Sequence, residues 1–446
     1  MYIKLLFLVL ISLLSACMPD SISINTPEAQ FSGSLTQVTL VGGSNEDVAR
    51  EIIQLRKGGL AVVGSTKSTD GDFSERTAND WDLFLIKFSL DGEILWKKTY
   101  GGSGDDFGFS VVETPEGGFV LLGYSNSQDG DVPPTQGYHD NWIIKIDADG
   151  AVVWKKSFGY SGHDHSYNLI ATQDGGYFFN GFLDVTASNG MGNDKKSSSA
   201  SRHGVGEFWC HKLDANGNIQ WRRYFGGTNN DRSYDAIQTR DGNFLVVGTS
   251  ESDDVDVKNP KGNYDVWVVM VSASGEMLWE NSYGGSLVDE ASKVIQDSYG
   301  HFRIIGNTRS SDQDITHSKG ESDAWQITLD PTGRLVGSYN FGGSEFDRGT
   351  AMSEWQWGSI FLTGYSRSSD GDFENNNGEN DIFLMYFPSN GTAKKTMTLG
   401  GEGQDFAHDI LIQTDGSVFL VGQSFSKNSP FEKNKGNGDI LMARWN

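Results

Sequence analysis

Four histidines and two carboxylates occur between positions 139 and 207 and have the side-chain types that bind transition metals or transfer protons near neutral pH. They are His139, His163, His165, His203, Asp164 and Glu207. If the fold brings them together, they form a transition-metal site or an acid/base site; otherwise they are polar loop residues. The chain has no His-Glu-x-x-His motif or comparable ligand spacing, so the pattern alone does not decide between these interpretations.

Pairs of aspartates two residues apart form a second candidate group. They are Asp70/Asp72, Asp129/Asp131, Asp254/Asp256, Asp312/Asp314 and Asp370/Asp372, and in the first, second and last pair a glycine stands between the two. Carboxylates on such a turn resemble part of a calcium loop, but the closing Glu of an EF-hand is absent. Because Asp also caps turns without a metal, we expect structural turns, with calcium as a cofactor being the alternative.

Two tryptophans, Trp355 and Trp357, occupy a turn in which comparable segments have Thr-x-Asp-Gly. Exposed indole rings can stack on sugars or on apolar side chains of a partner. The alternative is that they fold over the end of the sheet beneath them.

The candidate residues belong to a repeat. The signal Gly-Gly-Ser-x-x-Asp and its variants occur seven times, with first glycines at positions 42, 101, 159, 226, 284, 342 and 400 and therefore steps of 59, 58, 67, 58, 58 and 58 residues. A regular period of this length indicates a repeat architecture.

Each repeat contains four strand-like segments. In the second repeat they are Phe107–Glu113, Phe119–Tyr124, Asp140–Ile146 and Ala151–Ser157, separated by Gly, Asp and Asn turns. Four antiparallel strands in each of seven units predict an all-β, seven-bladed β-propeller. The seventh unit ends after its third strand, and residues 33–41 supply the missing one, so we expect an N-terminal strand to complete the last blade.

The pattern W-x-K-x-Y-G-G-S-x-x-D, then D-G-G-F, S-x-D-G-D and D-x-W-x-x-K resembles the β-propeller repeats of bacterial cell-envelope and secreted proteins, over residues 33–446. This resemblance implies the fold and almost nothing about activity.

Residues that recur in every blade are expected to serve the scaffold. This interpretation covers the aspartate after each glycine pair and an acidic residue that begins each third strand. The first set is Asp47, Asp106, Asp164, Asp231, Asp289, Asp347 and Asp405; the second is Asp82, Asp140, Glu207, Asp265, Asp323, Asp381 and Asp439. The alternative is a carboxylate ring that collects cations. Trp142, Trp209, Trp267 and Trp325, with Phe84 and Phe383 at matching positions, are expected in the core between blades.

Departures from the repeat are better candidates for function. The third blade runs 67 residues, its second glycine is replaced by Tyr160, and its long loop lacks the aspartate pair. We expect Tyr160 and the neighbouring histidines to be candidate binding residues. Cys210 and His211, which follow Trp209 in a strand, are expected in the core.

The N-terminus has the features of a targeting segment. Residues 1–17 combine Lys4, an apolar run too short to span a bilayer, and Leu14-Ser15-Ala16-Cys17, which resembles the lipobox of bacterial lipoproteins. That resemblance implies cleavage before Cys17, diacylglycerol and palmitate-type acylation of Cys17, and attachment to the outer membrane of a Gram-negative envelope. The alternative is a plain secretory signal. Residues 18–32 are polar and are expected to be a flexible tether.

The net charge of −24 argues against nucleic acid as a partner, and only two cysteines occur, so no intrachain disulfide framework is expected. No G-x-S-x-G or P-loop motif is present, and no catalytic residue can be assigned. The sequence therefore favours a lipid-anchored envelope scaffold that binds a protein or a glycan through propeller loops. The alternatives are an envelope polysaccharide hydrolase or lyase using loop-face carboxylates, and a structural subunit of an envelope complex.

Overall fold

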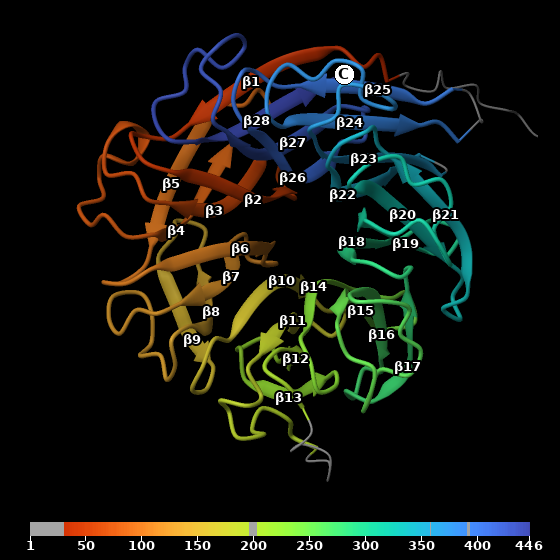
Figure 1. Cartoon of the computed structure of the whole chain (residues 1–446). Coiled ribbons are helices and arrows are strands. Elements are labelled where there is room, and N and C mark those ends of the chain that lie inside the picture. The colour runs from red at the N-terminus through yellow and green to blue at the C-terminus, as the bar shows by residue number, and fades with distance from the viewer. Residues whose placement is uncertain (1–30, 196–202, 357, 390–392) are drawn as a thin grey trace, which may run out of the picture.

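The computed structural model describes residues 31–195, 203–356, 358–389 and 393–446, which form seven four-stranded antiparallel sheets arranged in a ring (Figure 1). The innermost strands surround a central channel. This confirms the seven-bladed β-propeller. The expected targeting segment with Cys17, and all of the expected tether except Phe31 and Ser32, lie outside the described residues.

The strands follow one order in every blade, from the channel outward. Blade 1 contains β2 (Asp47–Gln54), β3 (Leu60–Thr66), β4 (Asp82–Phe88) and β5 (Ile94–Tyr100). Blade 2 contains β6 (Asp106–Glu113), β7 (Phe119–Ser125), β8 (Asp140–Ile146) and β9 (Val152–Phe158). Blade 3 contains β10 (His165–Ala171), β11 (Tyr177–Leu183), β12 (Glu207–Leu213) and β13 (Ile219–Phe225). Blade 4 contains β14 (Asp231–Gln238), β15 (Phe244–Ser250), β16 (Asp265–Val271) and β17 (Met277–Tyr283).

The remaining blades repeat this order. Blade 5 contains β18 (Asp289–Gln296), β19 (Phe302–Thr308), β20 (Asp323–Leu329) and β21 (Leu335–Phe341). Blade 6 contains β22 (Asp347–Trp355), β23 (Ser359–Ser366), β24 (Asp381–Phe387) and β25 (Lys395–Leu399). Blade 7 contains β26 (Asp405–Ile412), β27 (Val418–Ser424) and β28 (Asp439–Trp445), with β1 (Leu35–Val41) as its outer strand.

The ring is closed by pairing the two ends of the described chain. Strand β1 runs antiparallel to β28, from Leu35 beside Trp445 to Val41 beside Ile440. Phe31, two residues before the boundary expected from the sequence, is 4% exposed and packs edge-on against Phe361 of blade 6. Closure in this way leaves blade 7 with four strands and covers its outer edge.

The two faces of the disc carry different connections. Short turns join the first strand to the second and the third to the fourth on one face, which we call the turn face. The long loops and the crossings between blades lie on the other, which we call the loop face. Strand β1 starts at the turn face, because Leu35 pairs with the end of β28.

Apolar side chains of the third strands fill the space between blades. Trp142, Trp209, Trp267, Trp325, Phe84 and Phe383 are each no more than 2% exposed. The expected inter-blade core is therefore present. Cys210 and His211 are also fully buried, and His211 stacks on Phe179 with centroids 4.3 Å apart.

The recurring aspartates close the crossings between blades. In blade 2, Asp106 accepts hydrogen bonds from Gly102 N (2.6 Å), Ser127 Oγ (2.9 Å) and Ser125 Oγ. Burial raises the pKa of Asp106 to about 7. Gly101 lies between this carboxylate and that of Asp82, and a Cβ on it would stand 2.0 Å from Asp82 Oδ1, which explains the glycine at this position.

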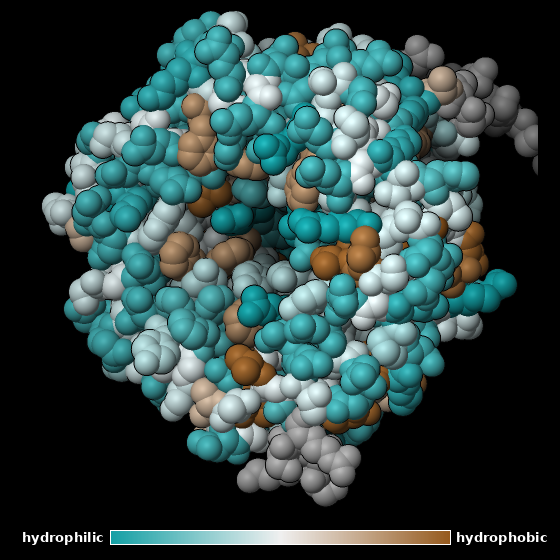
Figure 2. All heavy atoms as spheres, in the orientation of Figure 1, coloured by the Kyte–Doolittle hydropathy of each residue, from teal (hydrophilic) through white to brown (hydrophobic). Residues whose placement is uncertain are grey.

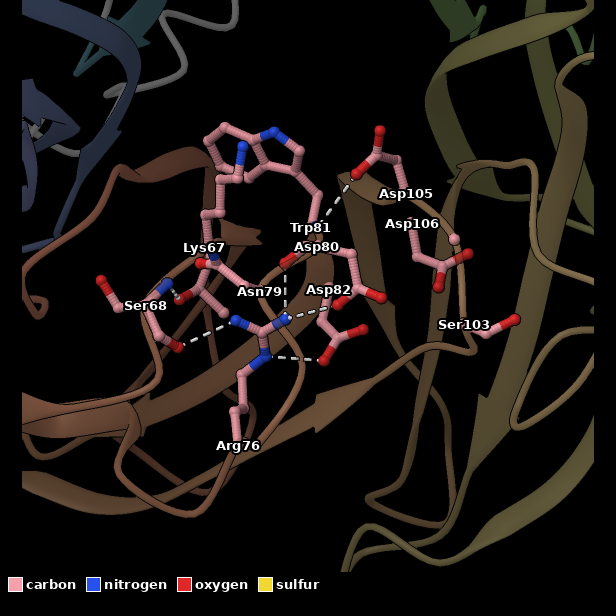
Figure 3. A network of polar contacts seen from close by, with 12 residues as sticks. Lys67, Ser68, Arg76, Asn79, Asp80, Trp81, Asp82, Ser103, Asp105 and Asp106 are labelled. Carbon is pink, nitrogen blue, oxygen red and sulfur yellow. Dashed lines mark hydrogen bonds and ion pairs between the residues drawn. The ribbon is translucent and has the colours of Figure 1, made fainter.

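Blade 1 satisfies its third-strand carboxylate with a buried arginine (Figure 3). Arg76 donates from Nε to Asp82 Oδ2 at 2.6 Å and from Nη1 to the Ser68 carbonyl at 2.8 Å. Its Nη2 donates to both the carbonyl and the carboxylate of Asp80. In blades 2, 4, 5, 6 and 7 the residue four positions before the carboxylate donates its backbone N–H instead.

Every innermost strand contains a β-bulge, and a glycine on the neighbouring strand makes room for it. The register of β6 with β7 shifts between Gly108 and Ser110, so Phe109 is the extra residue. A Cβ on Gly123 would stand 1.6 Å from the carbonyl oxygen of Phe107. Equivalent glycines follow in all blades, at positions 64, 181, 248, 306, 364 and 422, each 1.8–2.0 Å from a carbonyl by the same measure. Bulges of this kind re-aim a side chain, here into the channel.

Among the described residues, the one helical element is the 3-10 turn η1 (Gly71–Phe73), and no helix is long and apolar enough to cross a membrane.

Candidate functional site

The central channel is lined by the seven bulge residues, among which only Tyr occurs twice. They are Arg50, Phe109, Tyr167, Tyr234, Ser292, Thr350 and His408. Together with neighbouring side chains such as Arg348 and Tyr365 they surround a cavity of about 340 Å³. The face shown in Figure 2 is hollowed at its centre, where hydrophilic residues predominate.

The aromatic and cationic side chains of the channel lie together. The Arg50 guanidinium lies 5.4 Å from the Phe109 ring centroid, within the range of a cation–π contact. Arg348 pairs with Glu290 at 3.3 Å, whereas Arg50 forms no ion pair with any described residue. Burial lowers the pKa of Arg50. An arginine held in this way favours the approach of an anionic group.

Directly beside the bulges, a belt of polar side chains links neighbouring blades around the channel. Glu51 accepts hydrogen bonds from Val111 N (2.7 Å) and Ser110 Oγ (2.8 Å) of blade 2. Asn168 donates to Asp235 at 2.6 Å, joining blades 3 and 4.

The belt contains the lysine Lys293, whose Nζ lies 3.8 Å from both Asp235 Oδ1 and Asp409 Oδ1. About a quarter (27%) of its side chain is accessible, since the channel admits water although protein surrounds it. Burial acts to lower the pKa of Lys293, but the carboxylates of Asp235, Asp409 and Glu51 outweigh it and raise that pKa. Burial raises the pKa of Glu51 to about 7.

Three of the four expected histidines converge on the loop face, at the crossing between blades 2 and 3. His139 Nδ1 lies 3.0 Å from His163 Nδ1 and 3.2 Å from His165 Nε2. One ring nitrogen from each lies within 4.8 Å of the others. His139 and His165 are half-buried, and His163 is exposed.

Aromatic rings pack against two of these histidines. Tyr124 stacks on His165 with centroids 3.9 Å apart and an interplanar angle of 9°, and Tyr138 stacks on His163 at 5.1 Å. Burial, together with the neighbouring His139, His163 and Arg232, lowers the pKa of His165 to about 3. Burial also lowers the pKa of His139. Neutral imidazoles with free lone pairs are the form that binds a metal.

His203 does not join this group. Its Nδ1 lies 3.0 Å from Glu207 Oε2, a fully buried carboxylate that also accepts from Gly204 N at 2.8 Å. Burial lowers the pKa of His203 and raises that of Glu207, so both groups tend towards neutrality. The two residues form a contact separate from the other histidines.

Tyr160 replaces a glycine because blade 3 offers it space. In blade 2 a Cβ on the equivalent Gly102 would stand 2.7 Å from Asp129 Oδ1, and blade 3 has no such aspartate. Tyr160 instead packs on Trp209, with ring centroids 6.0 Å apart, and its N–H donates to Asp164 at 2.7 Å.

Asp164 has fewer donors than its equivalents in other blades. Where Asp106 receives two serine hydroxyls, blade 3 has the apolar residues Leu183 and Val185. Asp164 accepts from Tyr160 N and Asp184 N, and burial raises its pKa to about 8. It points into its own crossing loop.

Trp355 is 6% exposed and packs against Phe361 and Tyr386, with ring centroids 6.2 and 6.3 Å away. Such packing corresponds to the alternative in which the tryptophan folds over the end of its sheet. Trp357 lies outside the described residues.

The aspartate pairs, for which the sequence left calcium binding as an alternative, cap the crossing loops. Asp70 accepts from Ser44 N at 2.7 Å, and Asp72 accepts from Gly42 N at 2.9 Å and pairs with Lys435. The other pairs repeat the contact of their first aspartate: Asp129 with Ser103 N, Asp254 with Thr228 N, Asp312 with Ser286 N, Asp370 with Ser344 N. Asp372 additionally pairs with Lys319 and Lys394. The N–H of Asp131 donates to the Gly101 carbonyl at 2.8 Å, as the N–H of Asp372 does to the Gly342 carbonyl at 3.0 Å. Calcium stays a sequence-based expectation.

The sequence reasoning missed the channel residues. Two features of the sequence could have identified them. A glycine in the second strand of every blade marks the bulge opposite it, and the residue beside that bulge varies between blades. Aligning the seven repeats at this glycine singles out Arg50 and Lys293.

Comparisons with known proteins add the following. No family model matches the chain. A curated relative, the regulatory protein FlaEY of Caulobacter vibrioides, is 23% identical over 435 residues, which cover 86% of this chain and 45% of the relative. The chain thus spans less than half the length of that relative.

Several solved structures are similar in fold. They include the WD40 domain of Neurospora crassa Pan2 (10% identity, 91% of this chain and 95% of that one, TM-score 0.48) and Drosophila Plexin A in complex with Semaphorin 1b (11%, 93% and 88%, 0.44). A fungal alcohol oxidase in complex with copper is another (13%, 93% and 76%, 0.49). With TM-scores below 0.5, these likenesses say nothing about activity.

Proposed function

We propose that this protein is a lipid-anchored binding protein of the bacterial cell envelope, which engages an anionic group of a protein or glycan partner at the channel mouth on its loop face. The observation that carries the proposal is the contrast between the scaffold and the channel. The crossing aspartates are the same in all seven blades, whereas the bulge residues that face the channel are of six different types, with only Tyr occurring twice. Varied side chains on a rigid, repeated frame are the usual arrangement of a binding site.

The chemistry of the channel supports an anionic ligand group. Arg50 lies among Phe109, Tyr167 and Tyr365 without a carboxylate partner among the described residues. Aromatic faces and a guanidinium suit an acidic sugar or an acidic side chain, and Arg can hold a carboxylate through two hydrogen bonds. A regulatory protein as a distant relative is compatible with a binding role.

The position of the N-terminal end of the described chain supports the loop face as the binding face. The described chain starts at the turn face, where Gly33 N donates to the Asn446 carbonyl at 2.9 Å. An acylated Cys17 followed by a short tether would therefore attach at the turn face. The loop face would then point away from the membrane, towards a partner.

The hydrolase alternative has less support, because carboxylates of both recurring sets already accept hydrogen bonds within the scaffold. A turnover screen on envelope polysaccharides would detect such an activity if it exists.

Photo-crosslinking tests the binding proposal. A photoreactive phenylalanine analogue replaces either Tyr138 on the loop face (71% exposed) or Tyr299 on the turn face (68% exposed) in the native host. We expect adducts from position 138 that weaken when Arg50→Gln is added, and none from position 299. Equal adducts from both positions, or none from 138, would contradict the proposal. Protease digestion of the adduct distinguishes a protein partner from a glycan.

Lipid attachment is tested separately. Metabolic labelling with an alkyne fatty acid should label the wild-type protein and not Cys17→Ser, which should also leave the membrane fraction. A labelled Cys17→Ser protein would contradict the anchor without affecting the crosslinking result.

A further inference from the structure

We infer that His139, His163 and His165 form a binding site for one divalent transition-metal ion, at the crossing between blades 2 and 3. The inference is independent of the proposed partner and rests on the geometry of the three imidazoles.

The nitrogen atoms are arranged in a way that hydrogen bonds alone do not satisfy. His139 Nδ1 is within 3.2 Å of ring nitrogens from both His163 and His165. A ring nitrogen has either one proton or one in-plane lone pair, so it makes one good hydrogen bond and not two. At least one of these close contacts therefore brings two nitrogens together without a well-aligned proton. A cation between the three lone pairs removes this conflict.

The separations also suit a metal. A metal–nitrogen distance of 2.0–2.1 Å in tetrahedral geometry places ligand nitrogens about 3.3–3.4 Å apart. The two observed contacts, 3.0 and 3.2 Å, are close to that value, and the third pair is within 4.8 Å. Small side-chain rotations are enough to reach it.

The repeat brings the positions of His139 and His163 together at other described crossings, but none of those has a histidine at either position. His139 and His163 form an isolated bridge between blades, as Tyr264 and Val288, Ser322 and Phe346, and Asn380 and Gln404 do. One blade earlier, the corresponding residues are Trp81 and Asp105, and Trp81 N donates to Asp105 at 3.1 Å (Figure 3). The scaffold therefore does not require histidine at these positions.

Neighbouring groups hold the imidazoles in place. His165 lies between Tyr124, stacked at 3.9 Å, and Phe182, 4.8 Å away. Its other nitrogen, Nδ1, is 3.4 Å from the Tyr167 hydroxyl, which can accept the Nδ1 proton when Nε2 binds a metal. Asp105 supplies negative charge near His139, and Arg232 lies near His165 and acts against added positive charge.

Three imidazoles favour zinc, copper or nickel over calcium and magnesium, which prefer oxygen ligands. Since His163 is exposed, a ligand from solvent or from a partner can complete the coordination sphere, as in sites with three protein ligands.

Metal binding to the full-length, untagged protein tests the inference. After chelator treatment, calorimetric titration with Zn²⁺ should give one equivalent bound at the site, and Mg²⁺ should give no heat. Electron paramagnetic resonance of the Cu²⁺ form should show coupling to about three nitrogens. His165→Ala and His163→Ala should each weaken binding at least about 100-fold, since even outer-shell losses cost 10–100-fold.

Two controls make the outcome decisive. His163 is exposed, so His163→Ala should fold normally even if removal of the packed His165 ring does not. His301→Ala removes a histidine of another blade, paired with Asp297 at 3.6 Å, and should leave binding unchanged. The inference is overturned if the wild-type protein binds none of Zn²⁺, Cu²⁺ and Ni²⁺, or if His163→Ala binds them as tightly as the wild type.

Discussion

Lys293 of blade 5 and Asp409 of blade 7 approach one another across blade 6, with 3.8 Å between Nζ and Oδ1. At the same level blade 6 has Ala351, which has no polar group to contribute. The long lysine side chain therefore completes a belt that the other blades build from hydrogen bonds between direct neighbours. Asp409 continues it by accepting from Ile52 N of blade 1 at 3.1 Å.

Lys293→Met should lower the free energy of unfolding by about 3–5 kcal/mol, since removal of one partner leaves buried carboxylates uncompensated. The loss should be smaller at pH 5 than at pH 8. Without the lysine charge, the pKa values of Glu51, Asp235 and Asp409 rise further, and these groups bind protons in the folded state as the pH falls. Urea unfolding at both pH values measures this. Lys195→Met, which removes a side chain that is 57% exposed and whose partner Glu276 is also exposed, is the control; a similar small loss in both variants would show that the belt contributes little.

Gly123→Ala should destabilise the protein by about 3 kcal/mol or more, at the upper end of the range for overpacking, because its Cβ would meet the backbone carbonyl of Phe107. Gly206→Ala is the matched control, since the nearest atom to its Cβ is 3.6 Å away and its φ is not in the left-handed region. Chemical denaturation of both variants makes the comparison. An equal effect would mean that the bulge can shift without cost.

Arg76→Ala should cost about 3–5 kcal/mol, because the partly buried carboxylate of Asp82 loses the guanidinium that compensates its charge. The arginine side chain is 2% exposed. Arg334→Ala, in which the lost side chain is 76% exposed, should change the unfolding midpoint little. If Arg76→Ala behaves like the exposed control, Asp82 is satisfied by protonation rather than by the ion pair.

Asp106 should make the protein less stable as the pH rises from about 4 to about 7. Burial raises its folded-state pKa to about 7, above its unfolded value of 3.8, so in this window the folded state binds the proton and the unfolded state does not. Stability from this group is therefore highest at low pH and is lost as the pH passes through 7. Asp106→Asn keeps an acceptor for Gly102 N and cannot titrate.

The difference in unfolding free energy between wild type and Asp106→Asn, followed by urea unfolding from pH 4.5 to pH 8, should change by about 1.4 kcal/mol per pH unit up to about pH 7 and level off above it. Parallel profiles for the two proteins would mean that Asp106 keeps an ordinary pKa in the fold.

The amino-acid sequence by itself determined the number of blades, the strand that closes the ring and the residues of the crossings. The reason is that seven copies in one chain align with each other, so residues common to all copies can be separated from exceptions. Asp106 and Trp142 recur for a reason that every blade shares, and the structure confirms that they are buried.

Only the tertiary structure decided which exceptions meet. His139 and His163 come from different connections, and a distance of 3.0 Å between their nitrogens depends on how one blade is rotated against the next. The fold does not place His203 in this group, because its ring contacts Glu207 instead. The belt that contains Lys293 could not be predicted from the sequence for a related reason. A bulge reverses the alternation of side chains along the strand. The residues that face the channel therefore do not follow from the two-residue period of a strand alone.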